Sequence, residues 1–213
     1  MPGLLTVLPL AFVMVAGPQI ISAIFLATSE NWAKSSAAFV AGVFVTVTLF
    51  VTAAYVIVRL VFDAAGSSGE KSTRVGVDSV LLVLLAFAAW HTFHTRKTSK
   101  PPKWMGELEE ATPKTSFRLG FLLLGLFPTD LATNIVVGSH LARSSDPWWY
   151  YLPFVFLVVL FEALPALFVL LLGKKAAVIL PKVRDWMNTN SWVVSEVVLV
   201  FFIVLEANNL IGS

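Results

Sequence analysis

Six long apolar stretches constrain the fold of this chain more than any other feature of its sequence. A helix that crosses a bilayer needs about 20 predominantly apolar residues to span roughly 30 Å of hydrocarbon. Because no water reaches the backbone inside the bilayer, apolar stretches of this length are expected to be helices. The six predicted spans are Leu4–Thr28, Ala37–Val61, Val75–Phe93, Phe117–Leu141, Trp148–Leu172 and Trp192–Ile211.

The composition of the 213-residue chain agrees with a membrane protein. Apolar residues make up 57% of the chain and charged residues only 13%, about half the charged fraction that is usual in soluble domains. The formal net charge of +2 is too small for a nucleic-acid-binding surface, and the absence of cysteine excludes disulfides and thiolate metal sites. The sequence therefore predicts an all-α polytopic membrane protein with no cofactor, no metal and no nucleic-acid partner.

Basic residues are distributed unevenly between alternate loops. The group of loops that includes the long linker at residues 96–116 carries eleven of them, and the other group carries four. Because basic loops remain on the cytoplasmic side, the linker is predicted to be cytoplasmic and both termini to lie outside. The eleven are Lys34, Arg96, Lys97, Lys100, Lys103, Lys114, Arg118, Lys174, Lys175, Lys182 and Arg184; the four are Arg59, Lys71, Arg74 and Arg143.

The long linker divides the six predicted helices into two groups of three. Residues 1–95 form the first predicted repeat and residues 117–213 the second, and an odd number of helices in each makes the repeats inverted. An offset of 110 residues aligns Pro18 with Pro128 in the first helix of each repeat. Because proline removes a backbone hydrogen bond, both helices are predicted to be broken or kinked near the bilayer centre. The alternative is two kinks with no part in function.

Polar side chains accumulate near these two prolines. A charged side chain at the centre of the bilayer costs a few kcal/mol, so ionisable residues there need an explanation. Asp130 and Glu162 stand at about mid-depth, and Asn134 lies one turn after Asp130. We interpret the two carboxyl groups as proton carriers, as partners of a cationic group, or as a hydrogen-bonded clasp between helices. The predicted substrate or ion pathway comprises Pro18, Gln19, Ser22, Pro128, Asp130, Asn134, Glu162 and Glu196.

Several short motifs resemble a known family. Ala16-Gly17-Pro18-Gln19 and Ala38–Gly42 resemble the lysine-exporter superfamily. The order of motifs in and after the linker is similar to that of the peptidoglycolipid-addressing (GAP) family, which includes sulfolipid-addressing proteins. This resemblance implies a six-helix exporter in an actinobacterial plasma membrane that helps to deliver glycolipids to the cell envelope. The motifs in the linker are Pro102-Lys103-Trp104-Met105 and Thr112-Pro113, and those after it are Phe117-Arg118-Leu119-Gly120-Phe121 and Pro128.

The predicted function is that of a secondary transporter that moves a glycolipid or another amphipathic substrate, with proton coupling through the buried carboxyl groups. No nucleophile paired with a base is recognisable, so an enzyme is not expected. Two alternatives stay open: an exporter of a small solute such as an amino acid or a cation, and an accessory scaffold for lipid export. The expected partners are membrane lipids and the lipid or small-molecule substrate. A homodimer is a further possibility, because six helices are few to enclose a whole glycolipid.

Overall fold

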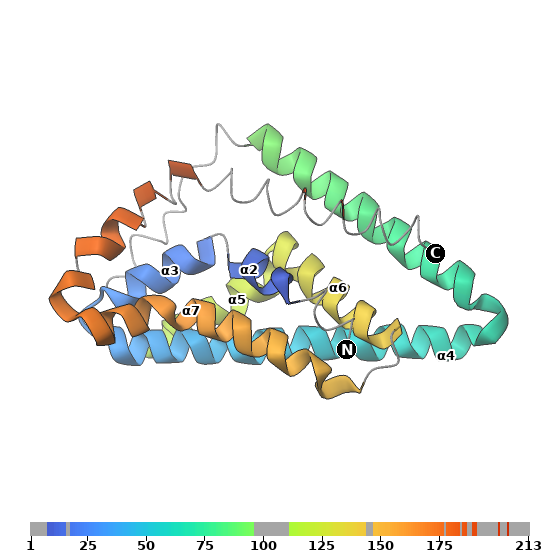
Figure 1. Ribbon diagram of the computed structural model, residues 1–213, viewed down its shortest axis with the longest axis horizontal. Helices are drawn as coiled ribbons and strands as arrows, with labels where there is room; N and C mark the ends of the chain where they lie inside the picture. The colour runs from blue at the N-terminus through green and yellow to red at the C-terminus, as the bar shows by residue number, and fades with distance from the viewer. Residues whose placement is uncertain are drawn as a thin grey trace.

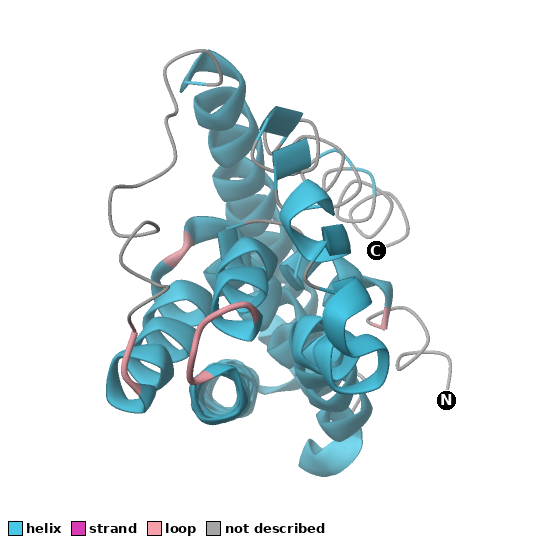
Figure 2. Cartoon of the chain, turned by 90° about the vertical axis from the view of Figure 1, so that its left-hand side faces the viewer, coloured by secondary structure: helices cyan, strands magenta, loops and turns pink. Residues whose placement is uncertain are grey.

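The computed structural model describes the chain in segments. They are residues 8–15, 18–95, 111–143, 147–176, 178–183, 185–186, 189–190, 200 and 204, and for some of these, including 64–82 and 84–95, only the backbone. Within these segments the chain is helical and contains no strand (Figure 2). This confirms the all-α class, whereas the six-span inverted repeat remains a prediction. The sixth predicted span falls almost wholly outside the described residues.

The first predicted span corresponds to two short helices. Helix α2 covers Pro9–Val15 and helix α3 covers Pro18–Ala27. The second helix begins at the proline that is predicted to interrupt the span, since proline lacks an N–H but suits the first position of a helix. Side chains from both helices, including Leu10, Met14 and Leu26, are buried in the core.

The longest element is helix α4, which runs from Trp32 to Thr95 over 64 residues. The sequence predicts two separate helices here. The structure corrects this prediction, because it has one continuous helix. Figure 1 shows it running along the lower edge of the molecule and then turning back sharply, in the teal part of the ribbon between the two predicted spans. Helices commonly kink at Gly and Ser pairs, and the intervening residues contain Gly66-Ser67-Ser68-Gly69 but no proline. The chain therefore turns without losing its helical backbone.

The fourth predicted span is broken in the structure. Helix α5 covers Pro113–Leu126 and helix α6 covers Pro128–Arg143, with a bend of 66° between them. Thr112 caps α5, accepting a hydrogen bond from the amide of Thr115 at 3.3 Å, so the helix starts before the predicted end of the linker at residue 116. The break at Pro128 agrees with the predicted interruption of this span.

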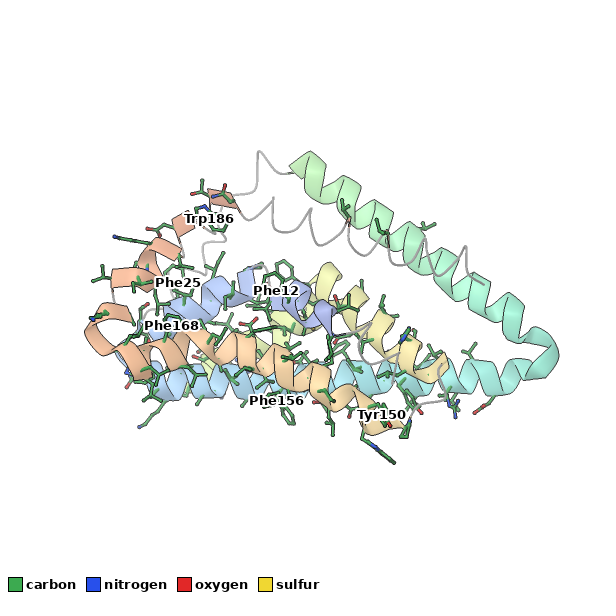
Figure 3. The ribbon with its side chains drawn as sticks, viewed as in Figure 1. Phe12, Phe25, Tyr150, Phe156, Phe168 and Trp186 are labelled. Atoms are coloured by element: carbon green, nitrogen blue, oxygen red, sulfur yellow. The ribbon has the colours of Figure 1, made fainter. Side chains whose placement is uncertain are left out.

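The fifth predicted span forms a single apolar helix. A short 3-10 helix, η2 (Trp148–Tyr151), leads into α7 (Leu152–Leu172), and η3 (Gly173–Lys175) follows it. The buried side chains of α7 lie on one face and include Phe154, Val158 and Glu162. The opposite face is apolar and exposed; Figure 3 shows Phe156, which is 65% exposed, pointing away from the bundle.

Two helices are long and apolar enough to cross a membrane, by length and composition. They are Trp32–Val61, the first part of α4, and Trp149–Leu172, and the bent pair α5 and α6 adds a third if it forms one span. This finding applies to the described residues. An outward apolar face also occurs on α4, where Ile57 is 60% exposed. Such faces are unusual for a soluble protein and typical of helices in contact with lipid.

Helices α4 and α5 cross with their backbones in contact. A Cβ atom on Gly42 would overlap the carbonyl oxygen of Phe117, and one on Gly120 would overlap the carbonyl oxygen of Phe39. Each glycine follows a phenylalanine by three residues, so the same pattern occurs on both helices at the crossing. Small residues allow such close approach, which is a common way of packing helices in membranes.

Candidate functional site

The two helix breaks meet at one hydrogen bond. The side-chain amide of Gln19 donates from Nε2 to Oδ2 of Asp130. Gln19 is the second residue of α3 and Asp130 the third residue of α6, so the contact joins the starts of two helices that are 111 positions apart in sequence. Both side chains are 2% exposed. The structure therefore places a carboxyl group and an amide together inside the helical bundle.

The local sequence explains why an acidic residue is tolerated at this point. Pro128 begins α6, and Asp130 lies in its first turn. Backbone N–H groups at the start of a helix carry partial positive charge and stabilise a nearby carboxylate. The side chain of Gln19, from the start of α3, adds a hydrogen bond to the same group.

Glu162 contributes a second carboxyl group from α7. It is 1% exposed, and neither of its oxygens has a hydrogen-bond partner among the described residues. Its carboxyl group interacts electrostatically with that of Asp130, so two ionised groups would repel each other. Glu162 precedes Pro165, which is also buried within α7. We refer to Gln19, Asp130 and Glu162 as the carboxyl cluster.

Oxygen atoms without a donor are the main chemical feature of this region. Besides both oxygens of Glu162, Oε1 of Gln19 and Oδ1 of Asn134 are buried and have no hydrogen-bond partner in the described part of the chain. Buried polar atoms without partners cost about 1–3 kcal/mol each. The buried side chains described here include no lysine or arginine that could compensate. The cluster is therefore suited to accept protons or another group that donates hydrogen bonds.

Two of the predicted pathway residues, Ser22 and Asn134, donate hydrogen bonds to backbone carbonyl oxygens and not to the carboxyl cluster. The Ser22 hydroxyl donates to the carbonyl oxygen of Pro18 at 2.7 Å, within its own helix. The Asn134 side-chain amide donates from Nδ2 to the carbonyl oxygen of Leu124 at 3.4 Å. Both residues are buried, and these bonds occupy the one donor of Ser22 and one of the two side-chain donors of Asn134.

The prolines and Glu196 complete the predicted set. Pro18 and Pro128 each begin a helix next to the carboxyl cluster, as expected for broken helices. Glu196 lies outside the described residues. Across the described segments, no group of three or more His, Cys, Asp or Glu side chains could hold a metal ion.

Sequence reasoning missed two contacts that join α4 to neighbouring elements. From α4, the Thr52 hydroxyl donates to Oη of Tyr151 at 3.0 Å, and Nη1 of Arg59 donates to the carbonyl oxygen of Ala142 at 3.4 Å. The latter contact places a cation at the C-terminal end of α6, where the helix dipole favours positive charge. In the sequence, Thr52 and Arg59 are recognisable only as polar residues within an apolar helix. That pattern does not indicate which groups they contact.

Comparison with known proteins identifies the family. No curated protein and no solved structure matches the chain. The family described as Sap, sulfolipid-1-addressing protein, matches residues 7–211. This match confirms the resemblance to sulfolipid-addressing proteins, while the wider lysine-exporter superfamily remains a resemblance. Because the match covers nearly the whole sequence, the chain belongs to the sulfolipid-1-addressing protein family.

Proposed function

We propose that this protein is a secondary transporter that moves a lipid or another amphipathic substrate toward the cell envelope, and that it is not an enzyme. One observation carries the proposal: the carboxyl cluster joins two helix breaks inside a bundle of apolar helices. Interrupted helices in corresponding positions of two halves are a frequent feature of transporter binding sites. The family description, which refers to the addressing of a sulfolipid, supports a lipid as the substrate.

Proton coupling through Asp130 and Glu162 belongs to the same proposal. Both oxygens of Glu162 and Oε1 of Gln19 lack donors, and protons bound to the carboxyl groups would supply donors there. The electrostatic interaction between the two groups means that the charge on one affects proton binding to the other. Movement of a proton through the cluster can therefore be linked to a change in how the helices pack.

The lipid is expected to travel along the outside of the bundle. The exposed faces of α4 and α7 are apolar, so they can contact the acyl chains of a lipid substrate. This arrangement needs no enclosed chamber large enough for a whole glycolipid.

We test the proposal by identifying the lipids that remain bound after purification. Mass spectrometry is expected to show one envelope lipid enriched with the wild-type protein and depleted with Asp130→Asn. Asp63→Asn is the matched control, because Asp63 is an exposed acidic residue of α4. Only bulk membrane lipid, unchanged between the proteins, would argue against a lipid substrate and favour a small solute.

The orientation in a bacterial plasma membrane is also a proposal, supported by the charges at one end of the bundle. The starts of α4 and α5 lie together, because the Ser35 hydroxyl donates to the carbonyl oxygen of Ala111 at 3.1 Å. The segment after α7 reaches the same end, since Ala176 packs against the last residues of α3. Figure 3 shows aromatic residues toward both ends, Trp186 at this end and Tyr150 at the other. The exposed basic residues at this end are Lys34, Lys114, Arg118, Lys175 and Lys182.

The cysteine-free chain allows this orientation to be tested directly. Single cysteines at the exposed positions Lys114 and Asp63 are expected to respond oppositely to a membrane-impermeant maleimide. In intact cells Asp63→Cys should be labelled, whereas Lys114→Cys should be labelled only after the membrane is permeabilised. The reverse pattern would invert the proposed topology.

A further inference from the structure

The break between α5 and α6 leaves a carbonyl group without its usual donor. In an α-helix the carbonyl oxygen of residue 124 accepts from the N–H of residue 128. Residue 128 is proline, which has no N–H. The amide of Phe127 does not compensate, because it donates to the carbonyl oxygen of Leu123 at 3.3 Å. The carbonyl group of Leu124 therefore needs a donor from elsewhere.

Asn134 supplies that donor from the far side of the break. Its Nδ2 lies 3.4 Å from the Leu124 oxygen, in a buried contact. Asn134 belongs to α6 and Leu124 to α5, so this bond connects the two helices across their 66° bend. The side chain is fully buried, and burial without a partner would be costly for both groups.

We infer that Asn134 is a positioning residue, a side-chain brace that replaces the backbone donor missing at Pro128 and holds the bend between α5 and α6. Asp130 lies one helical turn before Asn134, so fixing the start of α6 also fixes the Asp130 carboxyl group beside Gln19. The functional importance of placing Asp130 rests on the proposed function. The hydrogen bond across the bend does not depend on that function.

The brace is tested by two variants that separate hydrogen bonding from packing. Asn134→Leu keeps the number and branching of the side-chain heavy atoms but removes the donor, and Asn134→Gln keeps the donor. Asn190→Leu is the matched control, since Asn190 also donates to a backbone carbonyl, that of Trp186, but at an exposed site away from the bend.

The measured quantity is a distance across the bend, from spin labels on cysteines at Lys114 in α5 and Ile135 in α6. A straight helix over these 21 residues would span about 32 Å at about 1.5 Å per residue, and the bent pair is expected to give a single shorter distance. We expect Asn134→Leu to broaden the distribution and shift it toward longer distances. The Asn134→Gln and Asn190→Leu proteins should retain the single distance. An unchanged distribution in Asn134→Leu, or equal broadening in Asn134→Gln, would overturn the inference.

A second variant tests the stated cause and remains informative if Asn134→Leu does not fold. Pro128→Ala restores an N–H at residue 128, so a following Asn134→Leu substitution should have little further effect on the distance or on the yield of folded protein. If Asn134→Leu is as damaging in the Pro128→Ala background as in the wild-type chain, the brace is disproved. Neither measurement involves lipid. A negative result for the brace would therefore leave the proposed transport function untouched, and a negative result in the lipid experiments would leave the brace untouched.

Discussion

Glu162→Gln and Asp130→Asn are each expected to lower lipid flux and to abolish its response to a pH gradient. Each amide nearly preserves the shape of the side chain but cannot bind and release a proton. Glu162 and Asp130 are buried and interact with each other, so a change at either is expected to disrupt the pair. The measurement is flux into proteoliposomes with and without an imposed pH gradient.

Controls for these variants must separate transport from folding. Glu30→Gln removes an exposed acid and should transport at the wild-type rate. All proteins should elute as a single species in size-exclusion chromatography. Full, gradient-dependent flux in both correctly folded amide variants would show that the carboxyl groups are not proton carriers and would favour the clasp between helices.

Gly120→Ala is expected to lower the stability of the protein markedly, because Gly120 lies where α4 and α5 cross with their backbones in contact. The added Cβ would overlap the carbonyl oxygen of Phe39 and lie 3.1 Å from the amide nitrogen of Val43, which are both backbone atoms of α4. Backbone atoms cannot move aside as a side chain can, so α4 and α5 must separate. Overpacking of this kind typically costs about 1–3 kcal/mol.

Gly125→Ala is the matched control on the same helix. There the nearest atoms are side-chain carbons of Phe50 and Thr46, both at 3.2 Å, and they can shift by a few tenths of an ångström. Because alanine favours a helix over glycine by about 1 kcal/mol, this variant should be nearly neutral or slightly stabilised. Thermal unfolding followed by tryptophan fluorescence should show a clear fall in Tm for Gly120→Ala alone. Equal Tm values for the two variants would contradict the close crossing of α4 and α5.

The sequence predicted the features that depend on single residues with strong local effects. Proline at 18 and 128 indicated where two helices are interrupted, and helices begin at both residues. The apolar surroundings of Asp130 and Glu162 indicated two buried carboxyl groups, and both are buried. Their place in a transport pathway remains a prediction.

Features that depend on three-dimensional neighbours could not be predicted. Gln19 and Ser22 both follow Pro18 in the predicted pathway, but only the Gln19 side chain donates to Asp130, while Ser22 bonds to its own helix. Asn134 shares a helix face with Asp130, yet its partner is a carbonyl group exposed by a break in the preceding helix. The sequence did not predict the continuity of α4, because the polar and charged residues between the two predicted spans indicated a loop. Polar residues are also compatible with a helix, and the backbone stays helical there.

The most direct test of the central claim is lipid flux in proteoliposomes that contain only this protein. The lipid identified by mass spectrometry would be supplied on one side and its appearance on the other side measured over time. If the protein is a transporter, flux should exceed that of protein-free vesicles, increase when a pH gradient is imposed and fall in Asp130→Asn. Flux equal to that of protein-free vesicles, from protein that binds the same lipid, would contradict the account and favour an accessory scaffold.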